Sequence, residues 1–235
     1  MQPFLRDMDV PQLVAAFTAN KLRFAARLSE LPGATAGQAS GLTWVDSGIP
    51  LATFNGVDHA TLTEDEAAAS IAAVVAHFRK RGLPFHWGIG PEAQPAMPAQ
   101  LIAHGFAFDE TEPAMAADLH ALDETLPPVA DLTIVPVTTA AQVTQWVQTW
   151  GCGAPRFITN QWQTVYQGLW QRIPPAEFIL FLAMRGDEPV GTVYLYCHAG
   201  VAAVHYVVTP STLRRQGIGA TLTRHALQQA RAAGY

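Results

Sequence analysis

The chain has 235 residues, of which 49% are apolar and 14% are charged, a composition typical of a folded protein with a sizeable core rather than of a disordered chain. The formal net charge is −5 and no block of Lys and Arg occurs, so the electrostatic footprint of a nucleic-acid-binding protein is absent. No apolar run approaches the roughly 20 residues that span a bilayer. We therefore expect neither nucleic acid nor a membrane as a partner.

The cysteine and histidine content predicts neither a disulfide framework nor a metal centre. Cys152 and Cys197 form no CxxC pair, and the eight histidines show no spacing such as HxxxH or HExxH. The N-terminal Met1-Gln2-Pro3-Phe4 lacks the basic-then-apolar order of a signal peptide. These features together predict a cytoplasmic protein.

In the first half of the chain, the predicted elements are those of an α/β domain. Asp9 favours the start of a helix that runs to about Leu31. Thr63 and Glu66 form a capping-box pair at the start of a second helix, which Gly82 ends. The other predicted elements are strands at 42–45 and 50–54 around a turn at 46–48, a short strand at 85–89, a helix near 96–104 and a strand near 106–118.

A proline-containing stretch separates two parts that carry their own helix and strand signals. Residues 121–128 read Ala-Leu-Asp-Glu-Thr-Leu-Pro-Pro. The two prolines remove backbone donors and push the residue before each towards an extended conformation. We predict a linker here, and with it two domains at residues 1–125 and 130–235.

In the second half, two helices near 139–150 and 160–172 precede three strands. Residues 178–184 are apolar without alternation, which suits a strand buried on both faces. Strands over 190–196 and 201–208 follow, and apolar residues then recur at helical spacing from Gly217 onward. The predicted order is three strands followed by a helix.

The segment between the last strand and the last helix carries the strongest functional pattern. It reads Arg214-Arg215-Gln216-Gly217-Ile218-Gly219-Ala220-Thr221. Because glycine has no side chain, a phosphate can approach the backbone closely at Gly217 and Gly219. The first N–H groups of the following helix lack intrahelical partners and lie at the positive end of the helix dipole. With Arg214 and Arg215 beside them, these groups predict a pyrophosphate site.

Other interpretations of this loop are less favoured. Two known phosphate loops are excluded, because neither GxxxxGK[ST] nor GxGxxG occurs. In the alternative interpretation, the two glycines only allow the strand and the helix to pack closely, and no ligand binds. The coincidence of a strand, an arginine pair, spaced glycines and a helix favours the ligand site.

This loop resembles the acetyl-CoA loop of the GNAT N-acetyltransferases, in which an R/Q-x-x-G-x-G/A sequence joins three antiparallel strands to a helix. Residues 190–234 carry the resemblance. It implies the GNAT-like (acyl-CoA N-acyltransferase) α/β fold, a mixed and mostly antiparallel sheet flanked by helices, with acetyl-CoA as co-substrate and no metal. The acetyl-CoA-binding residues that it implies are Val207, Val208, Arg214, Arg215, Gln216, Gly217, Ile218, Gly219, Ala220 and Thr221.

The first half is similar to the later part of the same fold, which implies two tandem units. The helix over 64–81, the strand over 85–89 and His104-Gly105-Phe106 carry this similarity. Residues 57–63 stand in place of a glycine loop, so we expect a degenerate unit without its own cofactor site. The alternative is an unrelated α/β cap.

The resemblance also implies the chemistry, which is direct attack of a substrate amine on the thioester carbonyl, polarised by the backbone near 207–208. Many relatives use a glutamate on the fourth strand as the base, but here Ala203 and Val204 stand at those positions. His205 is the nearest titratable group and is the predicted base. The alternative is a histidine on the wrong face of the strand. Tyr206 is the second predicted catalytic residue.

Two further sets of side chains have competing interpretations. Cys197 is interpreted as a small buried residue rather than a nucleophile, because no His–Asp pair accompanies it in a motif. The aromatic side chains of Phe157, Trp162, Tyr166 and Trp170 either line an acceptor pocket or belong to the core.

We predict an enzyme that moves an acetyl group from acetyl-CoA to an amine of a small molecule or peptide. The alternative from another class is a catalytically weak acyl-CoA-binding or interaction module. A third possibility is an α/β domain whose glycine loop binds no ligand. Binding of acetyl-CoA separates the third possibility from the first two, and thioester turnover separates the first from the second.

Tyr235 stands where the family would begin a fifth strand, so the resemblance implies an exposed edge on the strand at 201–208. Exposed strand edges pair readily with other strands. We therefore expect the chain to self-associate, as a homodimer, through this edge. Sedimentation at several protein concentrations tests this expectation, and a monomer at every concentration would contradict it.

Overall fold

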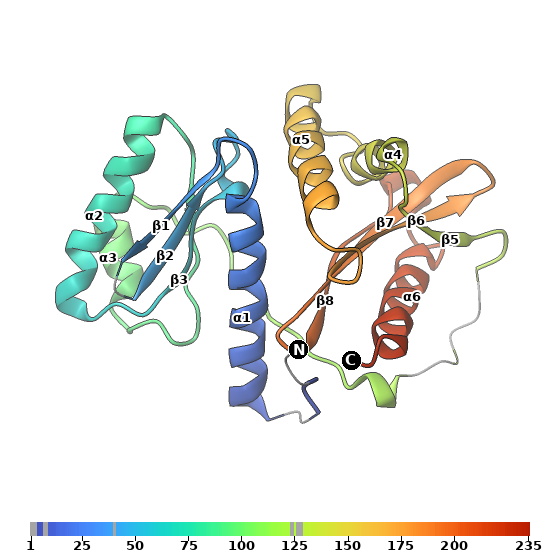
Figure 1. Ribbon diagram of the computed structural model, residues 1–235, viewed down its shortest axis with the longest axis horizontal. Helices are drawn as coiled ribbons and strands as arrows, with labels where there is room; N and C mark the ends of the chain where they lie inside the picture. The colour runs from blue at the N-terminus through green and yellow to red at the C-terminus, as the bar shows by residue number, and fades with distance from the viewer. Residues whose placement is uncertain (1–3, 7–8, 40, 123–124, 126–128) are drawn as a thin grey trace. The chain divides into compact units, whose positions relative to one another are not determined.

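The computed structural model describes residues 4–6, 9–39, 41–122, 125 and 129–235 (Figure 1). Contacts group the chain into two compact units, unit 1 from residues 1–20 and 116–235 and unit 2 from residues 21–115. Helix α1 (Val10–Ser29) contributes its first half to unit 1 and its second half to unit 2. The prolines of the predicted linker lie outside the described residues, and the division into domains 1–125 and 130–235 stays a prediction.

Unit 1 contains a four-stranded antiparallel sheet with the strand order β5-β6-β7-β8. Its strands are β5 (Thr133–Pro136), β6 (Phe178–Arg185), β7 (Glu188–His198) and β8 (Val201–Val208). Helices α4 (Ala140–Trp150) and α5 (Arg156–Arg172) come between β5 and β6, and α6 (Ile218–Ala232) follows β8. Strand β8 is therefore an edge strand of this sheet.

Alternation along β7 divides the core of unit 1 into two layers. Val193 and Leu195 are fully buried in one cluster with Leu222 of α6. Tyr194 points to the opposite face, where its ring contacts Trp146 of α4. The sheet thus lies between α6 on one side and α4 and α5 on the other (Figure 1).

The N-terminal residues join unit 1 through the end of β7 and the β7–β8 turn. The N–H of Leu5 donates to the carbonyl of Gly200 at 3.0 Å. The buried Asn20 donates from Nδ2 to the carbonyls of Tyr196 and His198, at 3.2 Å each. Asn20 thereby ties the first half of α1 to the end of β7.

Unit 2 contains a second four-stranded sheet, with the order β1-β2-β3-β4. Strands β1 (Thr35–Ala39), β2 (Leu42–Asp46) and β3 (Asn55–Ala60) are antiparallel, and β4 (His86–Trp87) pairs parallel with β3. Helices α2 (Glu64–Arg81) and α3 (Met97–Ala103) share one apolar core with this sheet. Three antiparallel strands followed by a helix therefore occur in both units, as tandem units of one fold would have them.

The helix predictions are confirmed, and the start of α2 shows why. The carboxylate of Glu66 accepts hydrogen bonds from the N–H of Thr63 at 3.1 Å and from its hydroxyl at 2.7 Å. At the other end, Gly82 adopts φ +64°, which glycine tolerates without steric cost. Both boundaries therefore follow from local chemistry that the sequence displays.

Several strand predictions for the first half are wrong. Residues 50–54 form no strand, because they lead through a short 3-10 turn into β3, which begins at Asn55. Residues 106–118 form no strand either. Phe106 packs against the core, whereas the apolar side chains after it face solvent, with Phe108 75% and Met115 93% exposed. The exposed strand β1 was missed because Thr-Ala-Gly-Gln-Ala lacks an apolar alternation.

Candidate functional site

The predicted loop joins the edge strand β8 to helix α6 in unit 1. After Thr209 and Pro210, the chain makes a 3-10 turn at Ser211–Leu213 and enters α6, with Gly217 as the N-cap. Helix α6 has 15 residues, and its first N–H groups lie at the positive end of its dipole. Gly217 makes no side-chain cap hydrogen bond, so no cap side chain occupies these donors.

Two loop residues have left-handed backbone conformations, Arg215 with φ +64° and Gly217 with φ +80°. Such conformations turn the chain so that successive N–H groups gather on one side, an arrangement that binds anions. Glycine adopts this conformation readily, whereas for a residue such as arginine it costs about 1–3 kcal/mol. Strain of this kind is concentrated at functional sites.

Two glycines near α6 have different roles. A Cβ at Gly219 would meet only Thr209 Oγ1 and Val207 Cγ1, both at 3.8 Å, so close packing does not require this glycine. A Cβ at Gly191 of β7 would lie 2.8 Å from Cδ1 of Leu222. Gly191 is thus the residue that allows α6 to pack on the sheet, whereas a side chain at Gly219 would make only ordinary contacts.

Arginine side chains hold the loop from both flanks. Nε of Arg214 donates to the carbonyl of Thr209 at 3.2 Å. Both terminal nitrogens of Arg185, at the end of β6, donate to Oε1 of Gln216 at 3.2 Å each. Together with the exposed Arg215, these guanidinium groups give the loop a positive charge that suits a phosphate.

Strand β8 carries a β-bulge just before this loop. The paired positions advance from 192 to 194 along β7 but from 208 to 205 along β8, so β8 has one extra residue. The bulge contains Tyr206, whose φ of +49° is rare for a bulky residue. Regular pairing therefore stops where the strand approaches α6.

The bulge brings two neighbouring side chains to the same face of the sheet. In a regular strand, successive side chains point to opposite faces. Here the ring of His205 stacks on Tyr194 with 4.9 Å between centroids and 27° between planes. The ring of Tyr206 contacts the same Tyr194 at 5.5 Å. The two predicted catalytic residues therefore lie together, on the side of α4 and α5.

Tyr206 belongs to an aromatic cluster that α4 and α5 cover. Its ring centroid lies 4.5 Å from that of Trp150, which lies 4.2 Å from that of Trp162. The hydroxyl of Tyr166 shares hydrogen bonds with Tyr194 and Tyr206. Burial, and then the neighbouring Tyr206, raises the pKa of both Tyr166 and Tyr194 well above its usual value. Both phenols therefore stay protonated at neutral pH and cannot act as bases.

His205 is the proton acceptor nearest to the bulge. His205 is an exposed residue, but its imidazole stacks on Tyr194, and the loss of hydration around the ring lowers the pKa of His205 to about 4. The ring is therefore neutral at pH 7, as a general base must be, but it is a weaker base than an ordinary histidine. His205 can therefore accept a proton, but with reduced basicity.

Of the remaining residues predicted to bind acetyl-CoA, some anchor the loop and others are exposed. Ile218 is 1% exposed and anchors the start of α6 in the core. The hydroxyl of Thr221 donates to the carbonyl of Gly217 at 3.0 Å. Ala220 is exposed, and Val207 is 37% exposed on the edge strand. Of these side chains, those of Ala220 and Val207 lie where a ligand can touch them.

Side chains outside the loop have positions less suited to catalysis or ligand binding. Burial raises the pKa of the Cys197 thiol to about 11, so this thiol is protonated and is no nucleophile at neutral pH. Within the predicted aromatic set, Tyr166 is 1% exposed and belongs to the core, whereas Phe157 is 57% exposed. The structure therefore does not bring this set together as one pocket lining.

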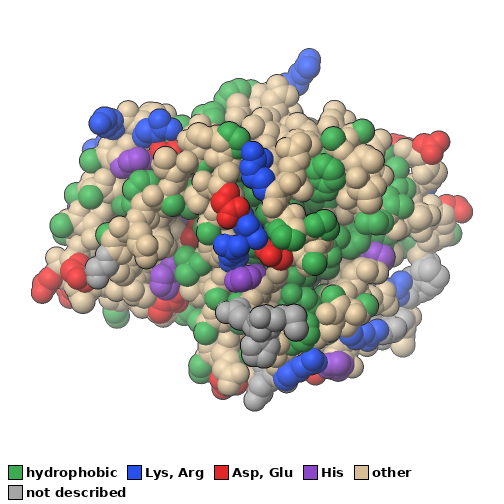
Figure 2. Space-filling view, viewed as in Figure 1, with side chains coloured by type: hydrophobic (Ala, Val, Ile, Leu, Met, Phe, Trp, Pro, Cys, Tyr) green, Lys and Arg blue, Asp and Glu red, His purple; other side chains and the backbone are tan. Residues whose placement is uncertain are grey.

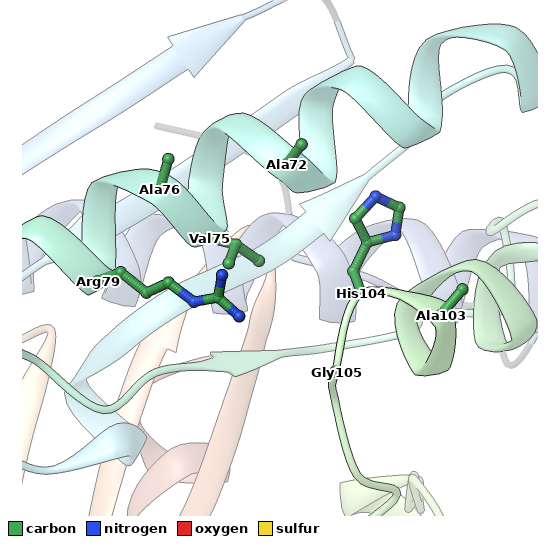
Figure 3. A pocket seen from close by; sticks show the side chains of 7 residues that line it. All are labelled: Ala72, Val75, Ala76, Arg79, Ala103, His104 and Gly105. Carbon is green, nitrogen blue, oxygen red and sulfur yellow. The ribbon is translucent and has the colours of Figure 1, made fainter.

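Unit 2 contains a separate hollow of about 550 Å³ between α2 and the end of α3 (Figure 3). Arg79 and His104 extend towards it from these two elements, and Nδ1 of His104 hydrogen-bonds with the carbonyl of Gln100 at 2.8 Å. The other lining residues are small: Ala72, Val75, Ala76, Ala103 and Gly105. None of the residues predicted to bind acetyl-CoA lines this hollow.

The charge distribution agrees with the composition. On the face shown in Figure 2, acidic and basic side chains are interspersed and form no basic stripe. In the part of the chain that the structure describes, no helix is long and apolar enough to cross a membrane. The same residues include no group of three or more side chains that could hold a metal ion.

Three residues that shape this site were missed from the sequence. Gly191 lies inside a strand, and a glycine there often marks a close backbone approach. Thr192 is a fully buried polar residue in an apolar strand, which is a signal that its hydroxyl has a partner. Arg185 follows directly after the predicted strand at 178–184, and nothing in its sequence neighbourhood points to Gln216.

Comparison with protein-family models matches residues 143–235, less than half of the chain, to the acetyltransferase (GNAT) family. The matched segment includes α4, α5, the strands β6 to β8, the loop and α6. Among proteins with curated descriptions, none matches this sequence significantly.

Solved structures share the fold at low sequence identity. A GCN5-related N-acetyltransferase from Kribbella flavida is 20% identical, with 97% of this chain and 83% of that chain covered and a TM-score of 0.71. A functionally unknown conserved protein from Staphylococcus epidermidis is 14% identical, with coverage of 84% and 79% and a TM-score of 0.54. A tandem GNAT protein from the clavulanic acid biosynthesis pathway is 16% identical, with coverage of 96% and 84% and a TM-score of 0.49.

Substitutions of Gly191 and Gly219 form a matched test of how α6 packs on the sheet. Gly191→Ala should destabilise the fold by about 1–3 kcal/mol, because its methyl group would overlap Leu222. Gly219→Ala should leave stability unchanged or raise it by up to about 1 kcal/mol, since it adds a helix-favouring residue whose methyl group makes only ordinary contacts. Urea unfolding of both variants measures the difference, and equal stabilities would contradict the assigned roles.

Proposed function

We propose that this chain, whose residues 143–235 form a domain of the acetyltransferase (GNAT) family, is an N-acetyltransferase that acetylates an amine of a small molecule or peptide. Family membership accounts for acetyl transfer in general, with acetyl-CoA as the donor that the family uses. The family match does not identify the acceptor, and we infer an amine of a small molecule or peptide.

The observation that carries the proposal is the start of α6, whose N-cap Gly217 makes no side-chain cap hydrogen bond, so that the first N–H groups of the helix are left for another acceptor. At Gly219 even a Cβ would make only ordinary contacts, with Thr209 and Val207 at 3.8 Å, so the backbone here is not closely covered. Arg214 and Arg215 add positive charge beside it. A pyrophosphate fits such a combination of donors and charge.

Residues along β8 and at the start of α6 would then have different roles in binding and catalysis. Arg214, Arg215 and the N–H groups at the start of α6 would hold the pyrophosphate. The open backbone edge at Val207 and Val208 would line the path from the loop to the bulge, where an N–H group would polarise a carbonyl. When bound, acetyl-CoA supplies the activated acetyl group as a thioester. His205 would accept a proton from the acceptor ammonium.

One observation favours the second candidate function, an acyl-CoA-binding or interaction module with weak catalysis. Strand β8 carries no carboxylate, and the pKa of His205 is lowered to about 4 by desolvation. A base this weak removes a proton from an alkylammonium with difficulty. Turnover, rather than binding, decides between the two functions. The cytoplasmic location and the homodimer through the edge of β8 stay predictions.

Calorimetric titration with acetyl-CoA tests the cofactor site. We expect micromolar affinity for the unchanged chain and a loss of at least about tenfold for Gly219→Glu, whose carboxylate would lie beside the pyrophosphate. Gln229→Glu is the matched control, because it adds the same charge on the exposed side of α6 near its other end. Absence of binding in the folded, unchanged chain would refute the cofactor site.

The role of His205 is tested by turnover with acetyl-CoA and a panel of amines. His205→Ala should lower kcat by at least about tenfold, with little change in the affinity for acetyl-CoA. Because the neutral imidazole is the active form, the contribution of His205 should be constant above about pH 5 and fall as the pH drops through about 4. Unchanged turnover in His205→Ala would rule out the residue as the base.

A further inference from the structure

The bulge in β8 changes the direction of one peptide unit. Tyr206, at φ +49°, lies between the paired positions 205 and 208. In a regular antiparallel strand, the residue after the paired His205 would direct its carbonyl to the other edge of the strand. The bulge instead brings the Tyr206 carbonyl within reach of Thr192 on β7.

A buried side chain holds this carbonyl. The hydroxyl of Thr192 donates to the carbonyl of Tyr206 at 3.1 Å, and Thr192 is 0% exposed, so this donor does not exchange freely with water. Next to Thr192 on β7, the carbonyl of Val193 accepts from Nε1 of the buried Trp146 at 3.3 Å, which ties α4 to the same part of the sheet.

The bond from Thr192 also determines where a neighbouring N–H group points. The carbonyl of Tyr206 and the N–H of Val207 belong to one peptide unit, which is trans, as are the other described peptide bonds. In a trans peptide, the C=O and N–H bonds point in opposite directions. Since Thr192 holds this carbonyl towards β7, the N–H of Val207 is directed to the open edge of β8.

We propose that Thr192 is a positioning residue for acetyl transfer. Its hydroxyl fixes the peptide between Tyr206 and Val207 so that the Val207 N–H faces the acyl carbonyl of the donor. The inference rests on the proposed function. It adds a residue that touches neither the donor nor the acceptor and acts through the backbone of the neighbouring strand.

The kinetic test compares three variants at position 192. Thr192→Val has the same shape without the hydroxyl, and it should lower kcat about tenfold while KM for acetyl-CoA changes less than about twofold. Thr192→Ser restores the donor and should return kcat to within about twofold of the original. Thr192→Ala also lacks the hydroxyl and adds no atoms, so it carries the same expectation if the valine variant does not fold.

A spectroscopic readout separates this proposal from the proposed function. The three-bond coupling between the amide and α protons of Tyr206 distinguishes φ near +49° from an extended conformation. The coupling should change towards the extended value in Thr192→Val and Thr192→Ala but not in Thr192→Ser. An unchanged coupling, or an unchanged kcat in an active protein, would overturn the proposal. If the unchanged chain neither binds nor turns over acetyl-CoA, the proposed function fails, while the coupling still decides whether Thr192 holds the bulge.

Discussion

Strand β8 pairs with β7 along one edge and forms the boundary of its sheet along the other, and the candidate site depends on this asymmetry. On the paired edge, the ladder is interrupted by one extra residue, and the hydroxyl of Thr192 holds the carbonyl of Tyr206. On the boundary edge, the backbone runs directly towards the loop at α6. The bulge costs stability because Tyr206 is held at positive φ, and the hydrogen bond from the buried Thr192 offsets part of that cost.

The corresponding junction in unit 2 shows what the loop of unit 1 provides. There, β3 leads into α2, whose first turn carries Glu64, Asp65 and Glu66. These carboxylates stabilise the helix by themselves, and Glu66 bonds back to the N–H of Thr63. A phosphate would meet three negative charges at this helix start. The same order of strands and helix therefore leads to the proposed binding site in one unit and to a self-capped helix in the other, and the difference lies in a few side chains.

The sequence predicts the elements around the site well because their signals are local. Gly217 and the apolar spacing after it place α6, and β8 has the predicted bounds of 201–208. The bulge could not be predicted, because it is a mismatch between two strands and neither sequence alone displays it. A regular strand would place His205 and Tyr206 on opposite faces, and only the bulge brings both rings against Tyr194. Gly191 and Thr192 did carry signals, a glycine and a hydroxyl in an apolar strand, but their partners are distant in sequence.

The division of the chain into units has a consequence for the order in which the molecule assembles. Unit 2 is one continuous stretch, whereas unit 1 is made from two stretches on either side of it. Asn20 must find Tyr196, which is 176 positions away, and closing so long a loop through a disordered chain is slow. During synthesis, unit 2 is complete before any strand of unit 1 has been made. Once folded, unit 2 replaces most of the chain between Asn20 and Tyr196 with a compact body. Less disordered chain then remains to be closed when the long-range contacts of unit 1 form.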